Sequence, residues 1–145
     1  MNRAPDLLLA FDFGLKRIGV ASGNRLTQTA TPVTTLIATD VPPWSQVDAL
    51  IAEWGPDILL VGDPGEGCGD RLGKALGEFV AGLRDRHPLP VELVDESFSS
   101  VAAEDALRTG RQKGIYNRRL SKGHIDSEAA CLIAEQWMNE KLEHA

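Results

Sequence analysis

The sequence predicts an α/β fold in one domain: a mixed five-stranded sheet, with three antiparallel strands followed by parallel ones, and helices on both faces. Three short strand-like segments follow one another near the N-terminus, and their short connections favour an antiparallel meander. Further along, strand-like segments alternate with helical ones, which requires parallel pairing through right-handed crossovers. Because 145 residues suffice for one ordinary core, we expect a single domain over residues 1–145.

The first three strands are predicted from short apolar runs. Residues 7–11 form a run of the buried-strand type, and Gly14 then allows a tight turn into a second strand at 18–21. Residues 30–36 are rich in Thr and Val, which favours a third strand. Since Pro32 cannot donate a ladder hydrogen bond, this third strand should lie at an edge of the sheet or contain a bulge.

The spacing of apolar residues becomes helical from Trp44 onward. A helix is expected from Trp44 to Trp54, and Gly55-Pro56 should end it. The following elements are a strand at 58–62, a helix over 72–83, a strand at 91–94, a short helix at 101–107 and a final helix at about 125–142. Trp44, Trp54 and Trp137 all fall at helical spacing among apolar residues, so we expect them in the core.

The composition is typical of a soluble globular protein, with 43% hydrophobic and 25% charged residues. No apolar run approaches the ~20 residues that a membrane-spanning helix needs. The first apolar run is interrupted by Asp12 and has no small-residue cleavage site, so it is a poor signal peptide. We therefore expect a cytoplasmic protein with no membrane partner.

The net charge of −6 argues against nucleic acid as a partner, but the cations are unevenly distributed. No acidic residue occurs from Ala106 to Ile125, and six cations lie there: Arg108, Arg111, Lys113, Arg118, Arg119 and Lys122. Residues 109–122 have no periodicity, which indicates a basic mobile loop. This loop either clamps a nucleic-acid backbone or is simply solvated.

Carboxylates occur at three places where sites of α/β sheets form. Asp12 lies at the end of the first strand in an apolar setting, where a charge must be paired, hydrogen-bonded or metal-bound. Asp95 and Glu96 end the last strand, and ligands of such sheets gather at strand ends. Asp126 is expected in the first turn of the final helix, where the helix dipole favours negative charge.

Carboxylates that converge repel one another unless a cation lies among them. Hard oxygen ligands prefer Mg²⁺ or Mn²⁺ to zinc, and such sites suit phosphoryl displacement assisted by two metals. Each acid also has an ordinary explanation: Asp126 as a helix N-terminal residue, and Asp95 with Glu96 as a solvated strand end. Since nothing short-range links these residues, the residues alone leave both interpretations open.

Several motifs occur together in the order typical of the YqgF family. The segment FDFGLKRIGVA at 11–21 is similar to the opening signature of that family. TATP at 29–32, VGDP at 61–64, VDE at 94–96 and DSEAA at 126–130 resemble its later motifs. The resemblance covers nearly the whole chain. Members of the family are described as Holliday junction resolvase homologues and as nucleases that mature the 5′ end of pre-16S ribosomal RNA.

The resemblance implies an RNase H-like fold, Mg²⁺ or Mn²⁺ as cofactor, and a nucleic-acid substrate, with RNA favoured over DNA but not separated from it by the sequence. The metal-binding and catalytic acids of the family fall on Asp12, Glu96 and Asp126, and only the resemblance selects Glu96 over Asp95. The implied activity is that of a nuclease, a hydrolase that processes pre-16S rRNA by two-metal phosphodiester hydrolysis. The protein would act as a monomer or homodimer.

Seven cations are the candidates for contact with the nucleic acid. Lys16 and Arg17 follow the Gly14 turn, and the others lie in the basic segment: Arg111, Lys113, Arg118, Arg119 and Lys122. His124, two residues before Asp126, is either a proton shuttle or a surface residue.

The chain departs from the family pattern beside the acids, and this keeps other functions open. Ser97 stands where the family has Arg, Asp63 replaces an apolar residue, and the glycine-rich loop 65–69 is acidic. One alternative is therefore a nucleic-acid-binding protein that keeps the fold without catalysis, and another is a Holliday junction resolvase-like DNase. A third is a relative of the actin-type ATPases, whose phosphate loop the turn after Asp12 resembles, but those proteins need two such domains.

Overall fold

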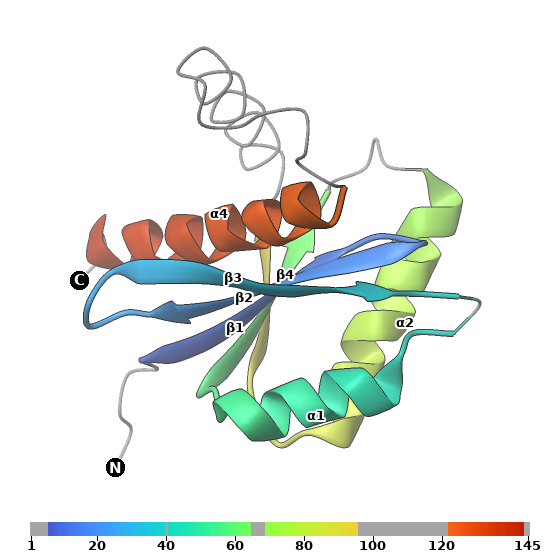
Figure 1. The fold of residues 1–145 in the computed structure, drawn as a ribbon, viewed down its shortest axis with the longest axis horizontal. Coiled ribbons are helices and arrows are strands. Elements are labelled where there is room, and N and C mark those ends of the chain that lie inside the picture. Colours follow the sequence, from blue (N-terminus) through green and yellow to red (C-terminus); the bar gives the residue numbers. More distant parts are fainter. Residues whose placement is uncertain (1–5, 40, 65–68, 96–121, 144–145) are drawn as a thin grey trace.

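A computed structural model describes residues 6–39, 41–64, 69–95 and 122–143. The elements in chain order are β1 Leu7–Phe13, β2 Arg17–Asn24, β3 Thr29–Ile37, α1 Trp44–Trp54, β4 Ile58–Asp63, α2 Asp70–Arg86, β5 Val91–Asp95 and α4 Lys122–Glu143. Figure 1 shows the sheet as a central layer, with α4 on one face and α1 and α2 on the other. The predicted α/β class, with a mixed sheet and helices on both faces, is confirmed.

The strand order in the sheet is β3-β2-β1-β4-β5. Antiparallel pairs join β3 to β2 and β2 to β1, whereas β4 pairs parallel with both β1 and β5. β3 is an edge strand, and its register against β2 shifts between Val20 and Ala21, where Pro32 pairs with Ala21. Both features that were expected from Pro32, an edge position and a bulge, are therefore present.

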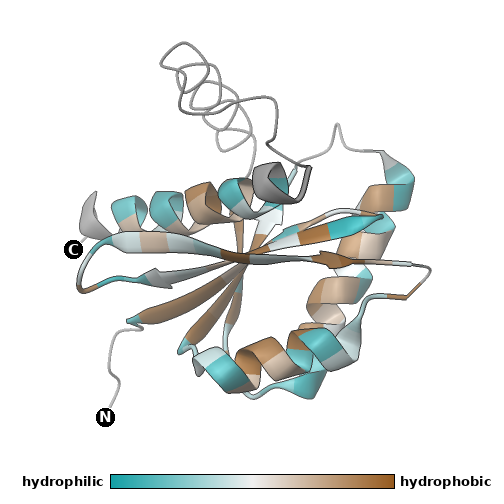
Figure 2. Cartoon of the chain, in the orientation of Figure 1, coloured by the Kyte–Doolittle hydropathy of each residue, from teal (hydrophilic) through white to brown (hydrophobic). Residues whose placement is uncertain are grey.

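Side chains of β1 alternate between two separate cores. Leu9, Phe11 and Phe13 pack with α1 and α2, whereas Leu8 and Ala10 pack with α4. Figure 2 shows the hydrophobic colour along the strands and on the sides of the helices that face them. Because successive side chains of a strand point to opposite faces, Asp12, which continues the series of Leu8 and Ala10, belongs to the α4 face.

The core between α1 and α2 is built around Phe79. The rings of Phe13 and Trp44 stack on it, with centroids 4.8 Å and 5.4 Å away. Trp44 lies along α2, where Gly82 leaves space for its indole ring. Trp137 is also in a core, at 4% exposure, but the expectation for Trp54 was wrong, because it is 42% exposed at the last turn of α1. Gly55 ends that helix in the left-handed conformation, as expected (φ 55°).

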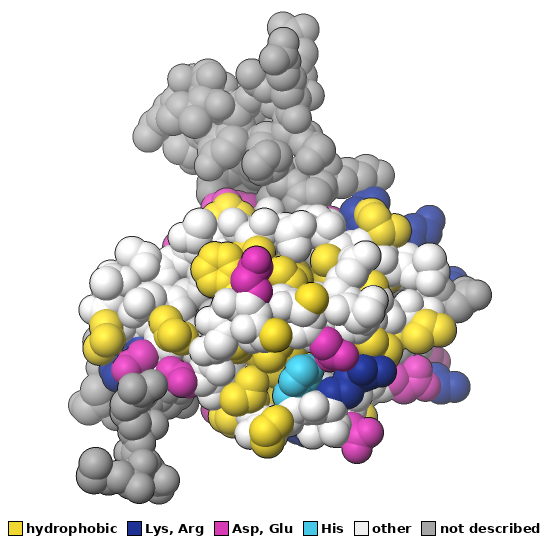
Figure 3. Space-filling model, turned by 60° about the horizontal axis from the view of Figure 1, so that its bottom comes forward, with side chains coloured by type: hydrophobic (Ala, Val, Ile, Leu, Met, Phe, Trp, Pro, Cys, Tyr) yellow, Lys and Arg dark blue, Asp and Glu magenta, His cyan; other side chains and the backbone are white. Residues whose placement is uncertain are grey.

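The carboxylate of Asp48 in α1 links this helix to the end of α2. It accepts hydrogen bonds from Arg86 and His87, each 2.8 Å long. Figure 3 shows the histidine beside acidic and cationic side chains on this face of the molecule. The link holds the two helices side by side on the sheet.

α4 begins at Lys122, three residues earlier than the sequence pattern predicts. The apolar periodicity starts only at Ile125, and Gly123 does not signal a helix, so the pattern misses the first turn. Asp126 is therefore not in the first turn, and no acidic residue is. The expected stabilisation of Asp126 by the helix dipole was wrong, since the dipole acts mainly on charges in the terminal turn.

Several sequence expectations lie outside the described residues. They include the helix at 101–107, all of the basic loop except Lys122, Glu96 with Ser97, and residues 65–68 of the glycine-rich loop. The prediction of one domain over 1–145 with a basic mobile loop therefore stays a prediction. Among the helices that the structure describes, none is long and apolar enough to cross a membrane.

Two helical glycines test the packing of Trp44. A Cβ at Gly82 would lie 2.5 Å from Cη2 of Trp44, whereas one at Gly77 would meet nothing within 4 Å. Gly77→Ala should therefore raise the free energy of unfolding by about 0.5–1 kcal/mol. Gly82→Ala should lower it by about 1–3 kcal/mol, because the indole ring must shift. Urea unfolding measures both, and an equal gain in the two variants would contradict the packing.

Cys131 in α4 is 3% exposed, and burial raises the pKa of its thiol to about 12, with Glu128 and Glu135 adding to the shift. Because only the thiolate reacts with disulfide reagents, Cys131 should be inert at pH 8 in the folded protein. A Cys68→Ser variant, which retains Cys131 alone, should react with a disulfide reagent only after urea is added. Rapid reaction without urea would show that α4 does not seal this position.

Candidate metal site between the sheet and the last helix

Asp12 was expected at the end of the first strand. It is the second-last residue of β1, which continues for one more residue to Phe13. It is half-buried and pairs with Gly19 of β2. On its other side the parallel register pairs Phe11 with Val61, so the next residue of β4 is Gly62. Asp12 is thus flanked on the α4 face by two glycines, so neither neighbouring strand places a side chain beside its carboxylate.

Gly19 brings the last helix into contact with the sheet. A Cβ at this position would overlap the main-chain carbonyl of Asp126 and would lie 2.9 Å from the nitrogen of Ser127. Only glycine allows two backbones to approach this closely. Asp12 and Asp126, which lie far apart in the sequence, are therefore both neighbours of one residue, Gly19.

Arg17 compensates the charge of Asp126. Its Nε atom lies 2.9 Å from Oδ2 of Asp126, and the side chains are 35% and 24% exposed. An ion pair this accessible contributes at most about 1 kcal/mol to stability. The importance of the pair lies in its position, because it places the guanidinium of Arg17 beside the carboxylate of Asp126.

α4 is also joined to β5, the strand at the other edge of the sheet. Gln136 donates a hydrogen bond of 2.9 Å to the carbonyl of Asp95, and the indole of Trp137 donates to the carboxylate of Glu92. The end of β5 is thereby held against α4. Glu96, the third acid of the predicted site, directly follows Asp95 in the chain but lies outside the described residues.

Asp63 does not share a face with Asp12. It ends β4, where Leu59 and Val61 pack toward α1 and α2 while Ile58 and Leu60 pack toward α4. The same alternation places Asp63 on the α1 and α2 face. The added negative charge expected beside the candidate site therefore points to the opposite side of the sheet.

The predicted nucleic-acid contacts are only partly within the described residues. Lys16 is exposed in the turn between β1 and β2, and its carbonyl accepts a hydrogen bond from Ala38. The side chains of Lys122 and His124, at the start of α4, are not described. The remaining candidates lie outside the described ranges: Arg111, Lys113, Arg118 and Arg119.

The carboxyl group of Glu135 on α4 has a raised pKa. Burial, followed by repulsion from Glu128, raises the pKa of the Glu135 carboxyl. Glu128 and Glu135 lie two turns apart, with Cys131 between them. Their side chains are not among the predicted site residues.

The donors near Gly19 fit a hard divalent cation. Asp12 and Asp126 offer carboxylate oxygens, which Mg²⁺ and Mn²⁺ prefer. Within 6–39, 41–64, 69–95 and 122–143 no group of three His, Cys, Asp or Glu residues is close enough to hold a metal. A third His, Cys, Asp or Glu ligand for such a cation would therefore lie outside those ranges.

Gly19 and Gly62 were not predicted as site residues from the sequence. A signal was present for Gly19, because a glycine within the apolar strand run IGVA weakens a strand unless a backbone or ligand approaches it. The partner of that approach could not be read from local pattern, since Asp126 is more than a hundred residues away.

Curated relatives match almost the whole chain. A Legionella pneumophila protein named "Putative pre-16S rRNA nuclease" is 43% identical over 136 residues, covering 91% of this chain and 94% of the relative. Proteins of the same name from Vibrio vulnificus and Marinobacter nauticus are 40% and 39% identical, covering 90% and 92% of this chain and 93% of each relative.

Solved structures agree on the fold. Thermus thermophilus RuvC in complex with a Holliday junction substrate superposes with a TM-score of 0.59 at 15% identity, covering 94% of this chain and 96% of that one. The Fowlpox virus resolvase, bound to Holliday junction DNA, gives a TM-score of 0.57 at 14% identity and covers 94% and 99%. The predicted RNase H-like architecture is thus confirmed. The family model RuvX, described as "Holliday junction resolvase", matches residues 6–140, and the chain therefore belongs to the RuvX family, also called YqgF.

Proposed function

We propose that this protein is a metal-dependent nuclease that hydrolyses phosphodiester bonds at the 5′ end of pre-16S ribosomal RNA. The nuclease class is supported by the RuvX family and by relatives of up to 43% identity that carry a nuclease name. The observation that carries the metal site is the contact at Gly19, which brings Asp12 and Asp126 to one face of the sheet.

In this proposal Asp12, Asp126 and Glu96 hold Mg²⁺ or Mn²⁺. Bound divalent metal would supply the activation of a water nucleophile and stabilisation of the leaving oxygen. The cation would also relieve the repulsion among the acids, a task that Arg17 performs for Asp126 in the structure described here. The fold contributes pre-organisation, because Asp12 lies on a paired strand and Asp126 on a helix packed against it.

Lys16 and Arg17 are the described cations closest in sequence to Asp12, and we assign both to phosphate contact. Lys16 is exposed in the β1–β2 turn and is free to turn toward a backbone phosphate. Arg17 already lies beside Asp126, so its guanidinium is placed to bind a phosphate oxygen at the acids. The basic segment 109–122 would extend this contact along the strand of nucleic acid.

RNA is proposed over DNA because the curated relatives carry a pre-16S rRNA nuclease name. Four-way DNA junctions are the competing substrate, since the family model and the solved structures of similar fold concern Holliday junctions. The assay therefore offers both substrates, a precursor ribosomal RNA end and a four-way DNA junction, under the same conditions.

Replacing either acid should abolish cleavage while leaving the fold intact. Asp12→Asn and Asp126→Asn remove metal-binding charge, and we expect Mn²⁺-dependent cleavage of the precursor RNA to fall by at least about a hundredfold. Cleavage is followed on gels in parallel with circular dichroism of each variant.

Asp63→Asn is the matched control, because it removes the same charge from the opposite face of the sheet and should leave cleavage near the wild-type rate. Undiminished cleavage by Asp12→Asn would refute the assigned site. Equal loss in Asp63→Asn would show that general charge, rather than this site, governs activity. Binding of RNA without cleavage in any metal would favour the non-catalytic alternative.

The contact at Gly19 gives a separate test of the geometry. Gly19→Ala should displace the start of α4 from β2 and so weaken Mn²⁺ binding at least about tenfold, beyond any loss of stability. Gly23→Ala, on the same strand, is the control, since its Cβ would meet only side-chain carbons of Leu8 and Ala134, at 3.0 Å or more. Calorimetric titration with Mn²⁺ measures both, and identical affinities would contradict the shared position of the two acids.

A further inference from the structure

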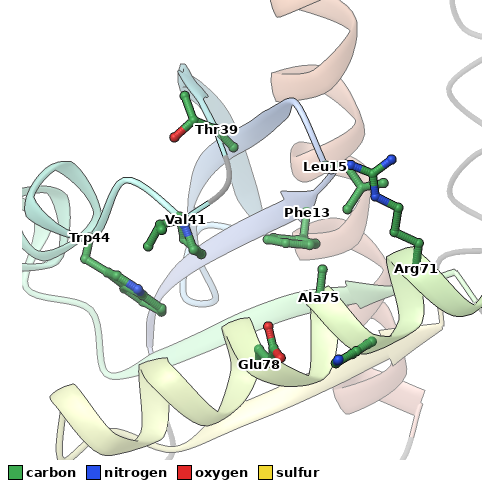
Figure 4. A pocket seen from close by; sticks show the side chains of 11 residues that line it. Phe13, Leu15, Thr39, Val41, Trp44, Arg71, Ala75 and Glu78 are labelled. Atoms are coloured by element: carbon green, nitrogen blue, oxygen red, sulfur yellow. The ribbon is translucent and has the colours of Figure 1, made fainter.

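A groove of about 530 Å³ lies on the α1 and α2 face of the sheet, opposite the acids. Its volume is within the range of about 300–1,000 Å³ that is typical of small-molecule sites. Phe13, Leu15 and Val41 form much of its apolar lining. Figure 4 shows Phe13 facing Ala75 of α2 across the middle, with Trp44 at one end and Arg71 near Leu15 at the other. Val41 is 61% exposed, so this apolar surface is accessible to a ligand.

The polar wall of the groove is cationic at one end. Arg71 and Lys74 line it from the first turns of α2, and both are exposed. Residues three apart share a helix face, and the helix N-terminus adds partial positive charge. Glu78, one turn further on, is the acidic residue among the described residues of the lining. In a chain of net charge −6, two neighbouring cations above an apolar floor favour a ligand with both a phosphate and an apolar part.

The groove and the candidate acid site both adjoin the end of β1. Phe13 directly follows Asp12, and the two side chains point to opposite faces of the sheet. Leu15 lies in the turn that leads to Arg17, which contacts Asp126. A nucleic-acid strand with its phosphate at the acids can therefore pass over this turn and reach Arg71.

We propose that the groove binds an unpaired nucleotide flanking the cleavage position, with its base on the apolar floor and its phosphate between Arg71 and Lys74. The proposal rests on the proposed nuclease function. A base has an apolar face that packs without sequence selection, as in other single-strand sites, and a phosphate matches the paired cations. An acidic peptide is the competing occupant, and the test below separates it from RNA.

Binding is measured without cleavage, as the fluorescence anisotropy of a labelled single-stranded oligouridylate in EDTA at low salt. Arg71→Gln and Lys74→Gln should each weaken binding about tenfold and reduce the salt slope by roughly 0.7. Arg25→Gln is the control for equal loss of charge, because Arg25 pairs with Asp6 and does not line the groove. Glu78→Gln should strengthen binding, since it removes a negative charge from the described lining.

A second variant pair tests the apolar floor without changing charge. Ala75→Leu fills the groove and should weaken oligouridylate binding, whereas Ala49→Leu, on the exposed side of α1, should not. A blunt RNA duplex, which offers no unpaired base, should be insensitive to Ala75→Leu. Equal loss on duplex and single strand would show that the substitution does not act by excluding a base from the groove, and would overturn the proposal.

The outcomes separate this proposal from the nuclease assignment. If Arg71→Gln and Lys74→Gln bind like Arg25→Gln while Asp12→Asn abolishes cleavage, the groove does not bind RNA and the nuclease assignment stands. If the groove variants lose binding but no protein cleaves RNA in Mn²⁺, the groove is supported and the catalytic assignment fails. Unchanged RNA binding in all groove variants, with capture of an acidic peptide that Lys74→Gln loses, would assign the groove to a protein partner instead.

Discussion

The backbone contact between β2 and α4 at Gly19 is the constraint on which the site depends. It fixes where the last helix crosses the sheet, because no side chain separates the two backbones at this point. From there α4 packs across β1, β2 and β3, and its residues Ile133, Trp137 and Met138 complete the core on that face. The main chain of Asp126 is held against Gly19, the strand partner of Asp12, as a consequence of this packing. Two acids that are distant in sequence thus both lie next to one residue that has no side chain.

The sheet divides the charged groups between its two faces. Strand alternation sends Asp12 toward α4 and sends Asp63 toward α1 and α2, so neighbouring positions on parallel strands contribute to different faces. The turn between β1 and β2 is common to both surfaces, since Arg17 contacts Asp126 and Leu15 lines the groove. A single turn therefore connects the proposed metal site with the proposed nucleotide groove.

The sequence predicts most of the fold because its local signals agree with the tertiary arrangement. The helix from Trp44 to Trp54 is found with both ends as expected, and Pro32 lies in an edge strand at a register shift. The predictions for the start of α4 and for the burial of Trp54 were wrong, since both depend on packing at the end of a helix and not on periodicity. The periodicity of apolar residues predicts the middle of a helix or strand better than its ends.

The candidate site was less predictable than the fold. Asp12 and Asp126 were predicted as candidate metal ligands from the sequence. The contact of Asp126 with Gly19 and its ion pair with Arg17 were not predicted, because they join segments that are distant in the sequence. No local periodicity encodes such contacts. The choice of Glu96 over Asp95 rests on family resemblance alone and stays a proposal, because Glu96 lies outside the described residues.

Paramagnetic broadening by Mn²⁺ tests the central claim most directly, because it locates the ion without requiring activity. At substoichiometric Mn²⁺, the account predicts selective loss of backbone amide signals around Asp12, Gly19 and Asp126, and recovery of those signals in Asp12→Asn. Broadening centred on the acidic surface of α4 around Glu135 and Glu140, and unchanged by Asp12→Asn, would contradict a metal site at Gly19.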